Sequence, residues 1–542
     1  MTINVPIDDR FCVNTQEYNS SLIYASGDIP NACKIERYLS ENKIVNHELI
    51  NLLLTNKDNF SIIIDNEDYV FAAVDRIKSY PLYYSGSNAV PLVSNSSQKI
   101  RSQLIKANIN HHAELMLAMS GYVFGNDTLY DEIKQLQAGE ILFWRKNTPL
   151  PEITQYYSYL AAANSTLSLD ALTEQFSDIL DSVISQLIKK AAGRVICLPL
   201  SGGLDSRLLL AKLVEHQYQN ILTFSYGPNG NHEMRQAERI AKQLGVPWHK
   251  VASNTKRART LYNSSLRKSY SEYAHGFTNI PSYMEFEAIS TLKNKQIIPN
   301  DALIVNGQSG DFISGGHVPE FLFRQSVSLD IMTKYCIDKH CSYWLHLKSE
   351  SNLKIIENII NQQLQKISND STMQLSPAAI YECWEWQERQ SKLVIRGQRL
   401  YDFFGFDWSL PFWHDEMMAF WSTVPYKFKR NQNLYINYLR KYNYKNVFST
   451  LRAKVQPWTL RYAWIPYAAK LIRLTFGKKQ KEKFYKKMHY YSTYHDQYAL
   501  FGHDYYLQYY KQIRDPASLM IRHYLDEMGF DIFYKDELTC VE

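Results

Sequence analysis

The sequence lacks the patterns that mark secreted, disulfide-bonded and membrane-spanning proteins. Its first ten residues contain no basic segment followed by an apolar one, and no uncharged run reaches the length of a transmembrane helix. The seven cysteines are scattered over 542 residues rather than arranged as a disulfide framework. We therefore expect a cytoplasmic protein.

A strong excess of charge of one sign is also absent. The net charge of +6 is modest for this length, with 45% hydrophobic and 21% charged residues. These values fit a globular enzyme and give no reason to expect nucleic-acid binding. Cys336, His340, Cys341 and His346 lie close together, but a second cysteine pair is missing and the residues fit a helix face. We therefore do not expect a zinc site there.

Two common phosphate-binding motifs are missing, and a different loop takes their place. No Gly-Lys-Ser/Thr occurs at P-loop spacing, and Gly-x-Gly-x-x-Gly does not occur at all. Instead, an apolar run suited to a buried strand (195–200) meets Ser-Gly-Gly-Leu-Asp-Ser (201–206) and then a helical stretch (208–214). Two glycines let the backbone approach an anion, and free N–H groups at a helix start favour phosphate oxygens. The implied ligand is ATP, with Asp205 able to hold Mg²⁺ that bridges the phosphates.

The chain divides into three predicted parts. Residues 1–162 alternate short β-like runs with turns, which favours a strand-rich first domain. In the second part, 168–460, strand-like and helical stretches alternate before a mainly helical end. This alternation predicts a parallel α/β sheet with crossover helices and a nucleotide at its carboxyl edge. The third part, 461–542, is a basic, tyrosine-rich helical extension.

The loop at 201–206 resembles the pyrophosphatase loop of the asparagine synthetase family, which splits ATP to AMP and pyrophosphate while a carboxylate becomes an acyl-adenylate. Segments 222–251, 305–316, 404–412 and 452–454 resemble later parts of that family, in the same order, the third in degraded form. The resemblance implies an adenine-nucleotide α-hydrolase-like fold for the synthetase domain. It also implies nucleotide-binding positions, which are Leu198, Ser201, Gly202, Gly203, Leu204, Asp205, Ser206, Ser225, Asn306 and Gly307.

The same resemblance assigns charged groups to the site. It implies that Asp311 joins Asp205 on Mg²⁺, as two carboxylates on separate loops suit a hard cation. It also implies that Lys454 stabilises the negative charge that develops during adenylation and acyl transfer.

The first domain resembles the family's glutaminase domain at 75–84 (Asp-Arg-Ile-Lys-Ser-Tyr-Pro-Leu-Tyr-Tyr) and at 128–139. This implies the four-layer αββα sandwich of N-terminal-nucleophile hydrolases. A working glutaminase of this kind needs an N-terminal cysteine, but residue 2 is Thr, and the family's glutamine-binding segment is not recognisable. We expect neither Thr2 nor Cys12 to act as a nucleophile, and we interpret the domain as degenerate.

The synthetase site departs from the family at a second position. The family's Gly-Glu-Gly-x-Asp-Glu reads Gly-Gln-Ser-Gly-Asp-Phe at 307–312, so the glutamate that helps to handle the incoming amine is Gln308. A glutamine cannot take a proton at neutral pH, so another base is required. Glu382, Glu385 and Glu388 are candidates, although we favour interpreting them as a solvated helix face.

These observations predict an ATP-dependent, AMP-forming amide ligase that joins a small-molecule carboxylate to ammonia or an amine, without glutaminase activity. Relatives that changed the amine suggest peptide macrolactam formation or amidation of a sugar carboxylate in surface polysaccharide synthesis. A non-catalytic nucleotide-binding scaffold is a further alternative. Gln308 and Phe312 favour it, while Asp205, Asp311 and Lys454 together count against it. Sulfur transfer lacks a suitably placed cysteine pair.

The basic segment 470–488 combines lysines with aromatic residues. Such a segment can contact an anionic membrane surface or a lipid-linked sugar, although we favour a solvated helix face. A homodimer is compatible with the sequence, which gives no sign of the oligomeric state.

Overall fold

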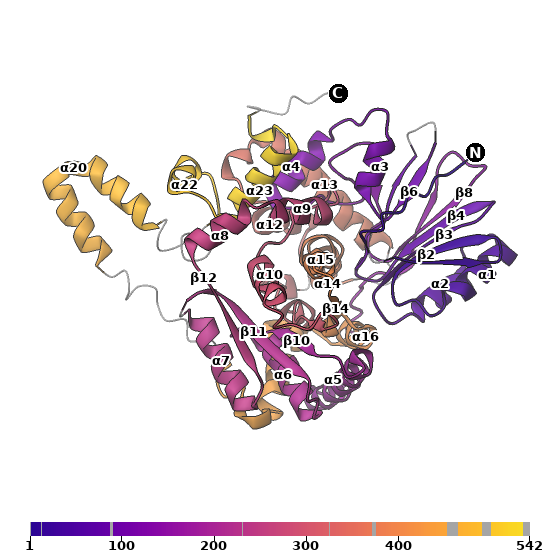
Figure 1. Ribbon diagram of the computed structural model, residues 1–542, viewed down its shortest axis with the longest axis horizontal. Coiled ribbons are helices and arrows are strands. Elements are labelled where there is room, and N and C mark those ends of the chain that lie inside the picture. Colours follow the sequence, from indigo (N-terminus) through magenta and orange to yellow (C-terminus); the bar gives the residue numbers. More distant parts are fainter. Residues whose placement is uncertain are drawn as a thin grey trace.

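A computed structural model shows a mixed α/β protein whose described residues form three β-sheets (Figure 1). Two sheets lie within the first 155 residues, and the third is built from strands between 196 and 409. The third sheet is parallel, which confirms the parallel sheet predicted for the second part of the chain. The structure describes residues 2–11, 13–86, 90–229, 231–324, 326–370, 375–451, 464–489 and 500–534.

The first part of the chain is a sandwich of two antiparallel sheets, with strand orders β1-β2-β3-β4-β8-β9 and β6-β5-β7. Apolar side chains of both sheets, such as Val70 and Val93, fill the space between them. Helices α1 and α2 cover the outer face of the larger sheet, and α3 packs on the smaller one, so the layers run helix, sheet, sheet, helix. The elements are β1 Asn14–Tyr18, β2 Ser21–Gly27, α1 Ala32–Asn42, α2 His47–Leu54, β3 Phe60–Asp65, β4 Tyr69–Val74, β5 Tyr83–Ser85, β6 Leu92–Ser94, α3 Ser97–Gln103, α4 His111–Ser120, β7 Lys134–Gln135, β8 Glu140–Arg145 and β9 Glu152–Gln155.

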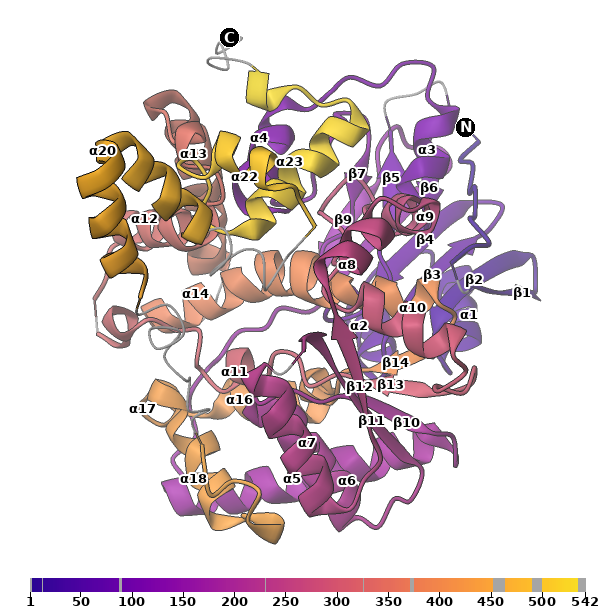
Figure 2. The same ribbon diagram turned by 60° about the vertical axis from the view of Figure 1, so that its left-hand side comes forward.

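The parallel sheet has the strand order β12-β11-β10-β13-β14 (Figure 2). From β10 the chain steps outward to β11 through α6 and to β12 through α7, and α6 packs beside both α5 and α7. The chain then returns to the other side of β10 as β13. The strand order therefore reverses between β10 and β13, where open α/β sheets leave a crevice for ligands. The elements are α5 Leu169–Ala191, β10 Ile196–Pro199, α6 Leu204–Glu215, β11 Ile221–Pro228, α7 His232–Leu244, β12 Trp248–Ser253, α8 Thr255–Tyr262, α9 Ser265–Ala274, α10 Phe286–Asn294, β13 Leu303–Val305 and α11 Gly310–Ile313.

The rest of the chain is mainly helical, as predicted, apart from the short strand β14 at the sheet edge. One long helical segment, 377–403, passes from α14 through a π-helical stretch into α15. A second core joins α4 of the first part to α12, α13 and α23. The elements are η1 Glu320–Phe323, α12 Leu329–His340, η2 Leu345–Leu347, α13 Glu350–Asp370, α14 Pro377–Glu385, η3 Trp386–Val394, η4 Ile395–Gln398, α15 Arg399–Phe403, β14 Asp407–Ser409, η5 Pro411–Trp413, α16 Asp415–Thr423, α17 Tyr426–Lys429, η6 Arg430–Gln432, α18 Asn433–Lys441, η7 Tyr444–Asn446, α20 Ile465–His489, α22 His503–Tyr509, α23 Pro516–Met528 and η9 Ile532–Tyr534.

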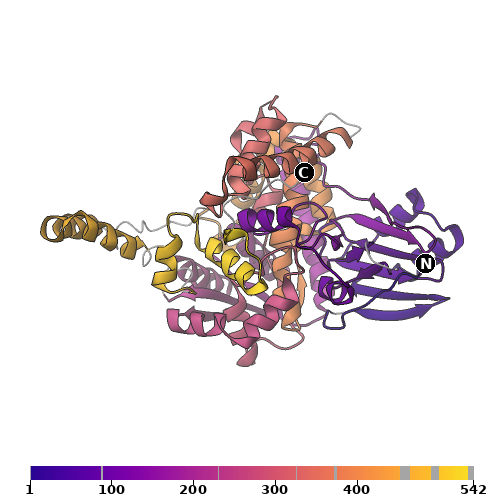
Figure 3. The same ribbon diagram turned by 90° about the horizontal axis from the view of Figure 1, so that it is seen from above.

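Helix α20 stands apart from the other elements and projects from the body of the molecule (Figures 1 and 3). None of the helices in the described residues is both long enough and apolar enough to cross a membrane.

Candidate active site

The loop 201–206 joins the central strand β10 to the start of α6, at the carboxyl edge of the parallel sheet. Gly203 precedes the first turn of α6, and no side chain caps that turn, so its N–H groups stay open to a ligand. The Ser201 hydroxyl accepts a hydrogen bond from the Gly203 N–H at 3.0 Å and lies 3.2 Å from the Ser206 hydroxyl. The loop is therefore folded tightly around the predicted phosphate-binding groups.

Arg207 connects this loop to a later part of the chain through hydrogen bonds. Its guanidinium is buried and donates to the Gly202 carbonyl at 2.6 Å. It also donates to the carbonyls of Val447 and Thr450, at 3.2 and 2.9 Å. The chain that runs on toward Lys454 is therefore tied to the loop, although Lys454 itself, like Cys12, lies outside the described residues.

A second loop follows β13 and contacts the first through two glycines. A Cβ atom on Gly307 would lie 2.7 Å from the Ser206 nitrogen, and one on Gly310 would lie 2.6 Å from the Asp205 Cγ. Such distances are shorter than any side chain tolerates, so only glycine permits this approach. The contact brings Asp311, the first residue after Gly310, against Asp205.

Asp205 and Asp311 form an acidic pair between the two loops. The Asp205 carboxylate accepts hydrogen bonds from the Asp311 N–H at 3.1 Å and from the Tyr435 hydroxyl at 2.8 Å. Burial, together with the negative charge of Asp311, raises the pKa of Asp205 to about 7. The Asp311 side chain is 56% exposed at the mouth of the site. Two carboxylates from adjoining loops, one of which raises the pKa of the other, suit a divalent cation that also takes phosphate and water ligands, so these residues fit Mg²⁺.

His317 lies between Asp311 of the acidic pair and Glu385. Its Nε2 lies 3.1 Å from the Asp311 carboxylate, and its Nδ1 lies 2.5 Å from that of Glu385. Burial alone would lower the pKa of His317, but the two carboxylates outweigh it and raise the pKa to about 9. For Asp311 the hydrogen bond and charge of His317 likewise outweigh burial and lower its pKa. His317 is therefore a cation that orients Asp311.

The interpretation of Glu382, Glu385 and Glu388 as a solvated helix face is wrong. Their exposed fractions are 0%, 0% and 2%, because the segment 377–403 passes through the interior of the fold, where most of its residues are buried. Glu382 pairs with buried Lys429 at 2.8 Å, and Glu388 with Lys392 at 2.7 Å. Glu385 accepts from His317 and from the Tyr381 hydroxyl at 2.6 Å. Its burial would raise its pKa, but the hydrogen bond and charge of His317 hold that pKa well below the usual range. None of the three is a free base.

Gln308 and Asn306 precede Asp311 in the second loop, and their side chains bind residues of the helical segment 377–403. The Gln308 side-chain carbonyl accepts from the Gln398 amide at 2.7 Å. Asn306 donates to the Tyr401 hydroxyl at 3.0 Å, and Tyr401 in turn donates to the Glu285 carboxylate at 2.5 Å. Burial raises the pKa of Glu285 to about 6.

Four residues of the site could not be predicted from the sequence: Glu285, His317, Tyr401 and Tyr435. Each is an isolated polar residue outside any motif, and each reaches the site only through the fold. Glu285 lies in a segment, 281–287, that shows no motif and no regular spacing of polar residues. His317 directly follows the two glycines at 315 and 316 but is not part of that motif.

A cavity of about 460 Å³ opens at the carboxyl ends of β11 and β12. Asn231 and Glu233 at the start of α7 line it, and a Cβ on Gly202 would lie 3.6 Å from the Glu233 Cα, so the cavity adjoins the 201–206 loop. Its other walls come mainly from β12, α8 and α10 and include Val251, Ser253, Leu261, Met284 and Phe286.

Two residues predicted to bind the nucleotide, Ser225 and Leu198, have side chains that contact other protein groups within the sheet and the core. The Ser225 hydroxyl donates to the Leu200 carbonyl at 2.6 Å and accepts from the Trp248 indole at 2.9 Å. Leu198 is fully buried in the core, whereas Leu204 is partly exposed at the loop.

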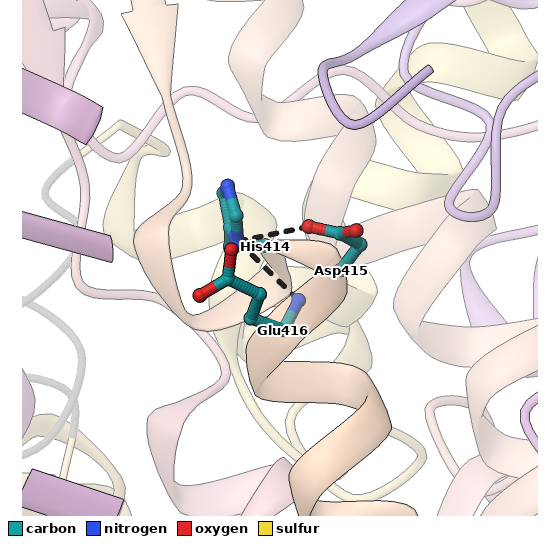
Figure 4. A group of neighbouring side chains, drawn as sticks. All are labelled: His414, Asp415 and Glu416. Atoms are coloured by element: carbon teal, nitrogen blue, oxygen red, sulfur yellow. Dashed lines mark hydrogen bonds and ion pairs between the residues drawn. The ribbon is translucent and has the colours of Figure 1, made fainter. Parts of the chain in front are cut away.

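A second group of metal-compatible side chains, His414, Asp415 and Glu416, lies around the start of α16 (Figure 4). Its members already have protein partners. Glu416 accepts from Gln186 at 2.8 Å and pairs with Lys57 of the first part of the chain at 3.4 Å. His414 and Asp415 pair with each other at 3.0 Å. This group therefore links two parts of the chain.

The family model for asparagine synthase matches residues 178–449, half of the chain, and includes both loops and the acidic pair. The chain belongs to the asparagine synthase family. It is accordingly a ligase-type enzyme that uses ATP. No curated protein matches the chain.

Solved structures give distant likenesses. The NH3-dependent NAD synthetase from Campylobacter jejuni subsp. jejuni NCTC 11168 is 12% identical, with a TM-score of 0.21 over 37% of this chain and 96% of that one. An allosteric regulatory enzyme of purine biosynthesis is 10% identical, with a TM-score of 0.16 over 44% and 61%. The glutamine phosphoribosylpyrophosphate amidotransferase from B. subtilis is 9% identical, with a TM-score of 0.14 over 54% and 63%.

Proposed function

We propose that this protein is an AMP-forming amide ligase that activates a small-molecule carboxylate with ATP and transfers the acyl group to ammonia or an amine. The observation that carries this proposal is the meeting of Asp205 and Asp311 across two glycine-dependent loop contacts. A scaffold that only bound nucleotide would gain nothing from holding two carboxylates where burial and mutual repulsion raise the pKa of one of them.

In the first half-reaction the substrate carboxylate attacks the α-phosphorus of ATP, and pyrophosphate leaves. The open N–H groups at the start of α6 and the hydroxyls of Ser201 and Ser206 bind phosphate oxygens. The adenosine moiety occupies the cavity beside α7, whose apolar walls suit a purine. Asp205 and Asp311 would hold Mg²⁺, which when bound neutralises charge on the departing pyrophosphate. Lys454 supplies a further cation.

In the second half-reaction the amine attacks the acyl carbonyl, AMP leaves, and the nitrogen gives up a proton. Gln308 cannot take that proton. We propose Glu285 as the base, because its carboxylate is linked through Tyr401 to Asn306, two residues from Gln308. Its raised pKa of about 6 leaves it ionised yet basic at neutral pH.

The first part of the chain is proposed to be a degenerate, N-terminal-nucleophile-type glutaminase domain. Thr2 is exposed, and Ile3 beside it is buried between the two sheets. The nitrogen then comes from free ammonia or an amine. The proposal leaves open whether the carboxylate substrate is a small-molecule acid, a sugar acid or a peptide.

Exchange of labelled pyrophosphate into ATP, screened over amino, sugar and peptide acids, tests the proposal. Exchange that depends on one acid is expected, and Asp205→Ala should abolish it. Asp178→Ala, which removes an exposed carboxylate on α5, is the matched control and should exchange normally. Acid-dependent exchange that survives in Asp205→Ala would refute the proposal, and so would the absence of exchange with every acid.

The base is tested separately. Glu285→Gln should leave pyrophosphate exchange intact, slow amide formation and remove the rise of its rate with pH near 6. Glu272→Gln, an exposed glutamate on α9, is the control. Unchanged amide formation in Glu285→Gln would reject this base and leave the ligase proposal standing.

A further inference from the structure

Helix α20 is an arm that projects from the body of the molecule (Figure 3), and it is made of two helical limbs (Figure 1). The limbs meet at Gly477, whose φ of 83° and ψ of 178° break the helix. The first limb has an inner face with Ile465 and Ala469 buried, and Trp464 packs against Phe484 of the second limb with ring centroids 6.1 Å apart. The two limbs therefore support each other.

The outer face of the first limb is apolar and exposed. Tyr467, Leu471 and Leu474 have exposed fractions of 78%, 63% and 76%, and their spacing of four and three residues places them on one stripe. Phe476, beside the turn, is 71% exposed. Of the 18 large hydrophobic residues exposed in the described part of the chain, six lie between 464 and 485. Scattered surface hydrophobics need no explanation, but such a concentration marks an interaction surface.

The charge of the arm has one sign. Residues 465–489 contain eight lysines and arginines and one glutamate, a net charge of +7. Since the whole chain carries +6, the other residues together carry −1. The positive excess of this protein therefore lies on the same element as its apolar stripe.

We propose that α20 binds an anionic membrane surface, with the Tyr467–Leu471–Leu474 stripe and Phe476 in the interfacial layer and the lysines against lipid head groups. A helix with one apolar face and a lysine-rich remainder lies in the plane of such an interface. Lys470 and Arg473 follow the stripe on the adjacent face, from where their long side chains reach the head groups. Lipid is favoured over nucleic acid because the exposed stripe contains leucines, which do not stack on bases. This inference is independent of the proposed catalytic function.

Sedimentation of the full-length protein with vesicles tests the inference. Binding is expected to vesicles of mixed phosphatidylcholine and phosphatidylglycerol, to be at least about tenfold weaker on pure phosphatidylcholine, and to weaken in high salt. Equal binding to neutral vesicles, or none to anionic ones, would overturn the proposal.

Two pairs of variants assign the binding to the arm. Leu471→Glu with Leu474→Glu should abolish sedimentation, whereas Ile105→Glu with Leu150→Glu, at sites 95% and 65% exposed in the first part, should not. Lys478, Lys479 and Lys483 changed to Glu should weaken binding, whereas the same change at exposed Lys34, Lys99 and Lys106 should have little effect. Equal loss in arm and control variants would overturn the assignment.

Two other partners are outcomes of the same experiment. Capture of a single-stranded oligonucleotide, without vesicle binding, would assign the arm to nucleic acid. Self-association that Leu471→Glu with Leu474→Glu abolishes, again without vesicle binding, would assign it to a second copy of the chain. Either result would refute the membrane proposal. Unchanged circular dichroism of the variants would show that they fold.

Discussion

Two regions of this protein gather carboxylates, and they do so in opposite ways. At the carboxyl edge of the parallel sheet, Asp205 accepts a hydrogen bond from the backbone of Asp311, and burial with the negative charge of Asp311 raises the pKa of Asp205 to about 7. In the helical segment 377–403, Glu382 and Glu388 are buried, but each pairs with a buried lysine. The first arrangement destabilises the ligand-free protein and suits a cation. In the second arrangement each carboxylate is already neutralised by a buried lysine, so these glutamates have a structural role.

This contrast shows that burial alone does not separate catalytic from structural acids. The charge of the neighbouring group makes the difference. An opposite charge at hydrogen-bond distance stabilises a buried carboxylate, whereas a like charge destabilises it until a cation binds. The variants below test that distinction, from the largest expected effect to the smallest.

Glu382→Gln should lower the free energy of unfolding by about 3–5 kcal/mol, because it leaves the Lys429 ammonium buried and unpaired. Denaturant titration measures this. Glu320→Gln, which breaks an exposed pair with Arg430, is the control and should cost less than about 1 kcal/mol. The double variant Glu382→Gln, Lys429→Met should recover part of the loss. If Glu382→Gln lowers the free energy of unfolding no more than the control does, Glu382 does not have the structural role given to it here.

Asp311→Asn should slow acid-dependent pyrophosphate exchange by about a hundredfold or more, since it removes half of the acidic pair while leaving an acceptor for His317. Its unfolding free energy should fall less than that of Glu382→Gln, because the lost pairing with His317 is offset by the lost repulsion with Asp205 and no buried lysine is left unpaired. Glu382→Gln, assayed at a temperature where it is folded, should exchange normally. A stability loss in Asp311→Asn without an activity loss would reverse the assignment of the two regions.

Gly310→Ala should slow pyrophosphate exchange by about tenfold or more, because its Cβ would meet the Asp205 carboxyl group and push the loops apart. Gly502→Ala provides the comparison, since no atom lies within 4 Å of the added Cβ. Normal exchange in Gly310→Ala would mean that the close contact between the loops is not needed for activity.

The stabilisation by Mg²⁺ and ATP should grow with pH. The folded-state pKa of Asp205, about 7, lies above its ordinary value, so the folded protein holds a proton that the unfolded chain releases. Stability from this group therefore falls as pH rises toward 7, and a cation must displace the proton below that pH. Thermal unfolding with and without Mg²⁺ and ATP, at about pH 6 and about pH 8, measures the difference.

Tyr435→Phe sharpens this test. It removes a hydrogen bond that lowers the pKa of Asp205, so the pH dependence should move to higher pH. A stabilisation that does not change with pH in either protein would contradict the raised pKa.

Thr2→Ala should change nothing. Amide formation is expected to depend on ammonia or an amine, and glutamine should not replace them, with or without this variant. Glutamine-dependent amide formation that disappears in Thr2→Ala would show that the first domain is a working glutaminase.

Much of the site could be predicted from local pattern. Loop 201–206 combines an apolar strand, two glycines and a helix start within a few residues, so its geometry follows from short-range conformational preference. Asp311 was found because it lies in a second recognisable motif. Glu285, Tyr401 and Tyr435 could not be found, since their partners lie between 95 and 230 residues away in sequence.

The segment 377–403 shows where the prediction failed. Glutamates at 382, 385 and 388, three residues apart, are typical of an exposed helix face, and only the tertiary structure surrounds that helix. The lysine partner of Glu382 lies 47 residues further on, in α17. No local pattern links the two positions.

The sequence by itself determined the parallel α/β architecture, the loop at 201–206 and the family, because each rests on contiguous residues whose backbone preferences agree. Tertiary structure decided which acids are paired, which face is buried and which groups meet at the crevice between β10 and β13. Those outcomes depend on the distances between charges and on the solvent removed around them, and both are fixed only when distant segments pack together.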